Sequence, residues 1–204
     1  GAPAIADKYT RARMALSCGA DLVLELPVCY SCASAEYFAQ GAVSLLNQIG
    51  ITDGLCFGSE SGDLASLKAL AHILSDESDE FSSALKAELR QGKNFAMARN
   101  DALISCMMKK QVHFSAIQNI YTLTDALSSP NNILGIEYLK ALLAQESSIV
   151  PYTIRREGAD YHSQELHGTL SSAAALRTLL RTASTPQILN NFMADPGYRL
   201  MEKV

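Results

Sequence analysis

Short apolar runs alternate with longer, mixed stretches along this chain. Three runs, over residues 21–27, 52–57 and 149–154, are rich in branched and aromatic side chains and stand beside Gly, Pro or polar residues. Runs of this length predict buried β-strands. Because helical stretches separate them, the pattern predicts an α/β fold with a parallel sheet flanked by helices.

The longer stretches carry apolar residues at helical spacing and are rich in Ala, Leu, Lys and Glu. One further stretch, 111–127, fits either the helix or the strand period, and we take it as helical. The stretch 62–127 forms a helical insertion in this interpretation. The other predicted helices cover residues 4–18, 35–49, 64–74, 80–90, 95–108, 133–144, 172–181 and 186–192.

Composition limits the classes of protein that the chain can belong to. Hydrophobic residues make up 48% of its 204 residues, which excludes a disordered chain, and no apolar run approaches twenty residues, so we expect no membrane partner. The 17 basic and 21 acidic side chains give a net charge of −4. No global basic field attracts nucleic acid, so an RNA partner has to be recognised by local arginines.

The five cysteines are an odd number in a chain whose first residues lack the apolar core of a signal peptide. We expect reduced thiols in a cytoplasmic protein. Cys29 and Cys32 form a single CxxC pair without a second pair or a histidine at ligand spacing, so small buried apolar residues are a better account of them than zinc or redox chemistry.

In an open parallel sheet, ligands bind beyond the carboxyl ends of the strands. Residues 57–62, after the second predicted strand, read FGSESG. Gly58 allows the backbone to approach a ligand closely, and the following helix start offers N–H groups to a phosphate or a ribose. The alternative is an ordinary turn in which Ser59 or Ser61 caps the helix and Asp63 complements its dipole.

Two pairs of polar residues are further candidates. Arg155 and Arg156 follow the third predicted strand, and their side chains point to opposite faces if the strand geometry persists, so at most one easily lines the crevice and holds phosphate. The alternative is a solvated pair. Asn131 and Asn132 either cap the helix that begins near residue 133, or one of them turns its amide toward a base or ribose.

A third candidate lies at residues 169–177, which read TLSSAAALR. Ser172 at the helix start offers hydroxyl and N–H donors, and Arg177 adds a cation, a combination suited to polyphosphate. The alternative is a capped, alanine-rich helix with a surface arginine. The four histidines of the chain show no i, i+4 pairing, so we expect no metal site.

Seven stretches in this order resemble the catalytic domain of the bacterial tRNA(Met) cytidine acetate ligase family. They span most of residues 1–181 and read DKYTRARMAL, GADLVLELP, SAEYFAQGAVSLL, FGSESGD, SPNNILGIEYLKALL, TIRREGADYHS and LSSAAALR. That family resembles the HIGH-type nucleotidyltransferases. The resemblance implies a Rossmann-like sheet that uses ATP, with Mg²⁺, to convert acetate to acetyl-adenylate.

The resemblance further implies transfer of the acetyl group to the N4 amine of the wobble cytidine of elongator tRNA(Met). Alternatives are another HIGH-type nucleotidyltransferase or a non-catalytic nucleotide- or RNA-binding module. The positions that match the family's ATP-binding residues are Gly58, one of Asn131 and Asn132, one of Arg155 and Arg156, Ser172 and Arg177.

The sequence departs from the family pattern in three places. Ala174 replaces a threonine in the ISSTxxR-like motif, and Asp160 stands where glycine is usual. The HxGH motif, whose histidines stabilise the triphosphate in this family, is absent from these 204 residues. We therefore expect the middle of a longer enzyme, with a partial catalytic domain over 1–181 and the start of a C-terminal helical region over 182–204, and we expect this piece alone to be inactive.

Overall fold

The computed structural model describes residue 4 and residues 6–75, 79–93, 95–109, 127 and 129–156. The chain forms two compact units, residues 1–25 with 157–204 and residues 26–156. Of the predicted helices, 172–181, 186–192 and nearly all of 111–127 lie outside the described residues. So do Ser172 and Arg177.

In the first unit, α1 (Lys8–Ser17) confirms the predicted N-terminal helix but is shorter than expected. The reason is Asp7, whose Oδ1 accepts hydrogen bonds from Tyr9 N at 2.8 Å and Thr10 N at 3.0 Å. An N-cap residue has extended backbone angles, so the helix begins only after it.

The strand predicted over residues 21–27 is wrong. The structure forms no strand there, and the apolar side chains are open to solvent, with exposed fractions of 59% for Leu22 and 42% for both Val23 and Leu24. Apolar composition gives a segment a preference for burial, but a strand also needs a neighbouring backbone for its N–H and C=O groups. Among the described residues, only the two strands of the second unit pair with each other.

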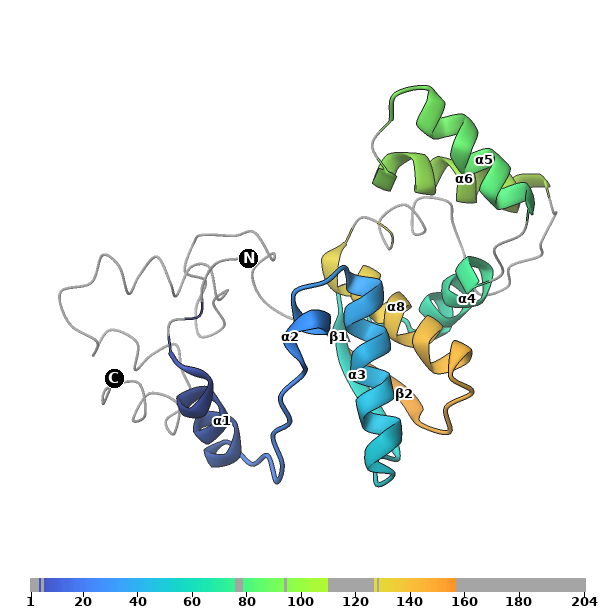
Figure 1. Cartoon of the computed structure of the whole chain (residues 1–204). Helices are drawn as coiled ribbons and strands as arrows, with labels where there is room; N and C mark the ends of the chain where they lie inside the picture. The colour runs from blue at the N-terminus through green and yellow to red at the C-terminus, as the bar shows by residue number, and fades with distance from the viewer. Residues whose placement is uncertain are drawn as a thin grey trace. The chain divides into compact units, whose positions relative to one another are not determined.

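The second unit is built on a parallel pair of strands, β1 (Gly54–Ser59) and β2 (Val150–Arg155). Both confirm predicted strands with shifted ends. In Figure 1, α8 (Pro130–Ala144) lies next to β1, and α3 (Ala35–Ile49), which agrees with its predicted bounds, packs on α8. A parallel pair with helical crossovers is the α/β, Rossmann-like arrangement that the sequence predicts.

Helix α8 is the centre of this unit, because it packs against α3, β1 and α4 (Leu64–Ser75). It approaches β1 so closely that a Cβ added to Gly135 would lie 2.5 Å from Cε2 of Phe57. Only a residue without a side chain fits there. The largest fully buried side chains of the core are Val43, Leu67, Leu70, Leu103 and Ile136.

The short helix α2 (Val28–Ser31), which sequence reasoning missed, precedes α3 and packs on it. The aromatic ring of Tyr30 lies directly over Gly41 of α3. All five cysteines are free thiols, but four of them are exposed, and Cys106 alone is buried. The expectation that they serve as small buried residues is therefore wrong for the CxxC pair, because Cys29 in α2 and Cys32 directly after it are both exposed to solvent.

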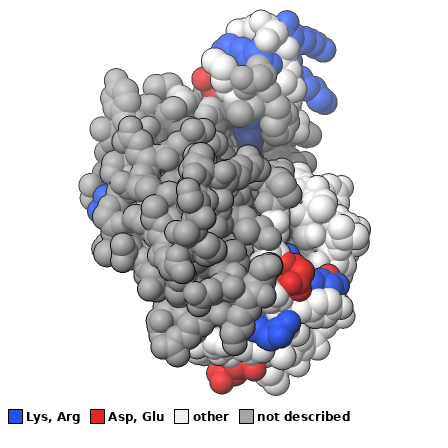
Figure 2. All heavy atoms as spheres, turned by 90° about the vertical axis from the view of Figure 1, so that its left-hand side faces the viewer, with Lys and Arg blue, Asp and Glu red and all other residues white. Residues whose placement is uncertain are grey.

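Helices α5 (Asp79–Arg90) and α6 (Phe95–Lys109) pack mainly on each other. Lys93 between them binds Glu88 at 2.6 Å and Asp101 at 2.7 Å. Several cations are visible on these helices at the top of Figure 2, yet the local acids balance part of that charge. None of the helices that the structure describes combines the length and apolar character needed to cross a bilayer.

An ion pair joins α6 to α8. The Arg99 guanidinium lies 3.2 Å from the carboxylate of Glu137, which is only 5% exposed. Lys140 reaches the other carboxylate oxygen of Glu137 at 2.8 Å. A buried carboxylate needs such partners, because burial without them is costly.

Candidate functional site

The two strands bring the predicted residues together at one edge of the sheet. Gly58 stands opposite Ile154, Ser59 stands opposite Arg155, and Arg156 N donates to Ser59 O at 2.8 Å beyond the end of β2. Two segments almost a hundred residues apart therefore end side by side. This juxtaposition is what the sheet prediction requires of a ligand site at the carboxyl ends.

Arg155 and Arg156 lie on opposite faces, as predicted. A Cβ added to Gly58 would lie 3.4 Å from Cγ of Arg156, so this arginine covers the strand-end glycine. A Cβ added to Gly62 would lie 2.7 Å from Cβ of Arg155, which places this arginine over the following turn. Both arginines are exposed. Arg156 is therefore the one that shares the open face with Gly58.

Two hydroxyl side chains, Ser59 and Thr153, join the two strand ends. Thr153 Oγ1 donates to Phe57 O at 3.1 Å, and Ser59 Oγ lies 2.7 Å from Thr153 Oγ1. Gly62 N donates to Ser59 Oγ at 3.0 Å. Because the Thr153 proton is used by the carbonyl, Ser59 must donate to Thr153. Ser59 is fully buried, and its hydroxyl fastens the turn to both strands.

The start of α4 is closed by the chain itself. Asp63 Oδ1 accepts from Ala65 N at 3.1 Å and Ser66 N at 3.2 Å, and its other oxygen accepts from the Ser66 hydroxyl. These N–H groups are therefore not offered to a phosphate, which corrects that expectation. Ser61 accepts from Asp63 N and so supports the turn, and the helix cap is Asp63 rather than a serine.

The start of α8 also holds a carboxylate, but one from a distant segment. Glu60 Oε1 accepts from Asn131 Nδ2 at 2.7 Å and Asn131 N at 3.2 Å, and Oε2 accepts from Asn132 N at 2.8 Å. Partial burial raises the pKa of Glu60, but these hydrogen bonds outweigh it, and the pKa lies below its ordinary value. Glu60 is thus held as a carboxylate.

Asn131 and Asn132 do not cap their own helix, whose cap position is Ser129. Asn132, only 2% exposed, instead uses its Oδ1 to accept from Glu60 N at 2.9 Å and Ser61 N at 3.2 Å. Sequence reasoning missed Glu60 and Thr153. The sequence around Glu60 does not single it out, since an acidic residue in a Ser- and Gly-rich turn is ordinary. For Thr153, the alternation of side chains along the strand predicted over 149–154 could have placed it on the same face as Arg155.

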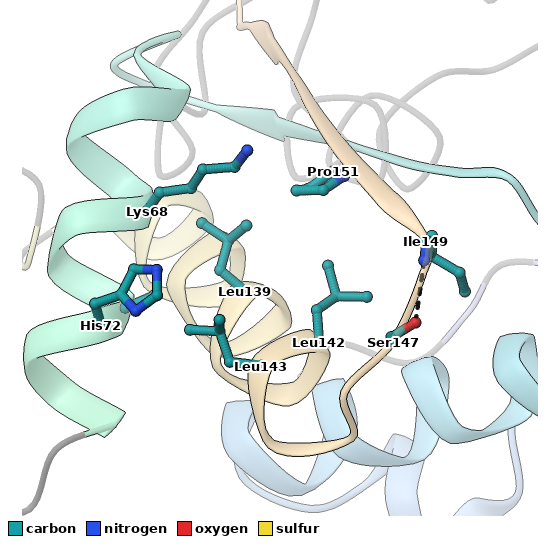
Figure 3. A pocket seen from close by; sticks show the side chains of 9 residues that line it. Lys68, His72, Leu139, Leu142, Leu143, Ser147, Ile149 and Pro151 are labelled. Carbon is teal, nitrogen blue, oxygen red and sulfur yellow. Dashed lines mark hydrogen bonds between the residues drawn. The ribbon is translucent and has the colours of Figure 1, made fainter.

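One pocket of about 230 Å³ lies away from these strand ends, between α4, α8 and the start of β2. Figure 3 shows Lys68 and His72 on one side of it and Leu139, Leu142 and Leu143 along its floor. Ile149 and Pro151 close it at the opposite end of β2 from Arg155. It is therefore separate from the candidate site, and no sequence motif points to it.

The class of protein follows from the family that the chain matches. All of residues 1–204 match the family model described as HIGH Nucleotidyl Transferase, so the chain belongs to the HIGH nucleotidyl transferase family. Within that class, it is similar to the tRNA(Met) cytidine acetate ligase of Clostridium novyi, with 45% identity over 201 residues, 98% of this chain and 48% of the relative. The ligase of Alkaliphilus metalliredigens is 49% identical over 186 residues, 88% of this chain and 42% of the relative.

Solved structures agree with this relationship. Apo Thermotoga maritima TmcAL superposes with a TM-score of 0.90 at 35% identity, covering 98% of this chain and 46% of that protein. The same protein bound with alpha-thio ATP gives a TM-score of 0.85 at 34% identity, covering 98% and 44%. The chain spans about half the length of the curated relatives it matches.

Proposed function

We propose that this chain is the nucleotide-binding catalytic part of a cytoplasmic tRNA(Met) cytidine acetate ligase, with the partial catalytic domain over residues 1–181. The similarity to named ligases over nearly the whole chain carries the proposal. A relative bound with alpha-thio ATP supports ATP as the nucleotide. The juxtaposition of Gly58, Arg156 and the Asn131–Asn132 turn at the strand ends is consistent with it.

In the proposed reaction, an acetate oxygen attacks the α-phosphorus of ATP, the bond to the β-phosphate oxygen breaks, and pyrophosphate leaves. The N4 amine of the wobble cytidine of elongator tRNA(Met) then attacks the acetyl carbonyl, AMP leaves, and the amine loses a proton. Such chemistry depends mainly on positioning and on cations near the developing phosphate charge.

Each proposed contact has a geometric reason. Gly58 has no side chain to block the open face, and the aliphatic stem of Arg156 lies beside it, so the guanidinium at its end can pair with phosphate. Among the described residues, Asn131 Oδ1 remains without a partner and can meet the nucleotide, whereas Asn132 is buried and holds the neighbouring turn. Ser172 and Arg177 are two further proposed contacts to the nucleotide, and only the sequence supports them.

Magnesium would enter with the nucleotide. The described residues hold no group of three or more His, Cys, Asp or Glu side chains that could bind a metal ion. Of the described carboxylates near the strand ends, Glu60 and Asp63 already accept hydrogen bonds from helix N-termini. The phosphate oxygens of ATP are therefore the proposed ligands, and bound Mg²⁺ would neutralise their charge.

The full-length gene product tests the reaction. With ATP and acetate it should exchange labelled pyrophosphate into ATP, and with tRNA(Met) it should form acetylcytidine at the wobble position. A transcript with uridine at that position is the control and should remain unmodified. Exchange that ignores acetate would favour another nucleotidyltransferase, and ATP binding without turnover would favour a binding module.

Arginine variants test the proposed geometry. Replacing Arg156 by Ala should weaken ATP binding by roughly tenfold or more, because a charged hydrogen-bonding partner is lost. Arg155→Ala should have a smaller effect, since that side chain lies over Gly62. Arg90→Ala, on the exposed end of α5, is the control and should bind ATP as the wild type does. Equal affinities for all three variants would remove Arg156 from the site.

A further inference from the structure

The turn after β1 and the first turn of α8 are joined by a closed set of hydrogen bonds. The carboxylate of Glu60 accepts three, at 2.7, 2.8 and 3.2 Å, from Asn131 and Asn132. In return, the Asn132 side chain accepts two, at 2.9 and 3.2 Å, from the backbone of Glu60 and Ser61. Each segment thus satisfies the free N–H groups of the other.

This arrangement differs from ordinary capping because the capping residue is far from the helix in the sequence. Asp63 and Asp7 cap the helices that directly follow them in the chain. Glu60, by contrast, caps a helix that begins seventy residues further on. Removing a local cap frays one helix end, whereas removing the Glu60 carboxylate also leaves the turn after β1 attached to α8 only by the two hydrogen bonds to Asn132 Oδ1.

A helix N-terminus attracts an anion because its N–H groups and dipole point outward. At α8 this place is filled by the chain's own carboxylate, and the hydrogen bonds there hold the group ionised. Asn132, which completes the set, is buried. The anion and its receptor therefore form a fixed joint beside Gly58, where the proposed nucleotide site lies.

We propose that Glu60 is a positioning residue for nucleotide binding: its carboxylate occupies the anion site at the start of α8 and so fixes the turn that directly follows Gly58 and Ser59 at the strand end. The inference rests on the proposed function. It assigns the N-terminus of α8 to Glu60 and not to a phosphate of ATP. It also predicts that removing the carboxylate opens a site for a small external anion.

The test uses the full-length gene product and α,β-methylene-ATP, which cannot release pyrophosphate. Glu60→Ala should weaken binding of this analogue about tenfold, as expected when several charge-assisted hydrogen bonds are lost. Sodium formate should restore part of the affinity and raise the melting temperature of this variant, relative to the same concentration of sodium chloride. Wild type should show neither effect, because Glu60 fills the site.

Two further variants sharpen the result. Glu60→Gln has nearly the same shape but turns an NH₂ group toward N–H donors, so it should bind the analogue weakly and ignore formate. Asp7→Ala removes a comparable helix-capping carboxylate that is not among the proposed nucleotide contacts, and should bind the analogue normally.

Unchanged affinity in both Glu60 variants would overturn the inference, and so would an equal response of wild type and Glu60→Ala to formate. If Glu60→Ala does not fold, the affinity of Glu60→Gln decides alone: weaker binding supports the role and normal binding refutes it. If wild type binds no nucleotide, the proposed function fails and the inference, which rests on it, fails with it. Nucleotide binding by wild type with normal binding by both variants refutes only the inference.

Discussion

The buried hydroxyl of Ser59 offers the sharpest test of how the strand ends are held. Ser59→Ala removes the hydrogen bond that Gly62 N donates at 3.0 Å and the contact with Thr153 Oγ1 at 2.7 Å. Ser59 is 0% exposed, so water does not simply replace the hydroxyl. Two lost hydrogen bonds at about 1 to 1.5 kcal/mol each predict a loss of about 2 to 3 kcal/mol.

Urea unfolding of the 204-residue chain, followed by circular dichroism, measures this loss from the shift of the midpoint. The corresponding change in melting temperature is roughly 5 to 10 °C for a domain of this size. Ser31→Ala is the matched control, because the hydroxyl of this exposed serine makes one long contact, at 3.5 Å, with the described residues, and its loss should change stability by less than about 0.5 kcal/mol.

A double-mutant cycle separates the pair from the turn. Thr153→Val keeps the shape but removes the hydroxyl that Ser59 meets. The coupling energy between the two substitutions should be about 1 kcal/mol. A loss no larger than that of the control, or a coupling energy near zero, would refute the proposed chain of hydroxyl groups.

Two predictions concern neighbouring contacts. Partial burial of Glu60 opposes its ionisation, but the hydrogen bonds from Asn131 and Asn132 lower its pKa overall. The contribution of Glu60 to stability is therefore present above the pH of about 4.3 where an unfolded glutamate titrates, and it is lost as the pH falls through the lower pKa of the folded state. The difference in unfolding free energy between wild type and Glu60→Gln should shrink from about pH 6 to about pH 3, and a constant difference would contradict this sign. Gly135→Ala should destabilise the chain by about 1 to 3 kcal/mol despite the better helix propensity of alanine, because the new Cβ would lie 2.5 Å from the Phe57 ring. Thermal unfolding measures this change. If the variant is as stable as the wild type, the Phe57 ring moves aside.

The pattern of the sequence determined the elements whose signals are local. Helix α3 has its predicted bounds because an apolar face ends at Gly50, which adopts a left-handed backbone with φ of 72°. Two apolar runs became β1 and β2. The third, over 21–27, did not become a strand, because pairing depends on a partner that a run cannot specify by its own composition.

The candidate site divides in the same way. Alternation along a strand predicted that Arg155 and Arg156 face opposite sides, and the fold class predicted that Gly58 meets them at the strand ends. Only the tertiary structure decided that Arg156 shares the open face with Gly58. It also decided that Glu60 binds the start of α8, because that contact joins residues some seventy positions apart. Hydrophobic period and helix signals act over a few residues, whereas this hydrogen-bonded joint depends on how β1 packs against α8.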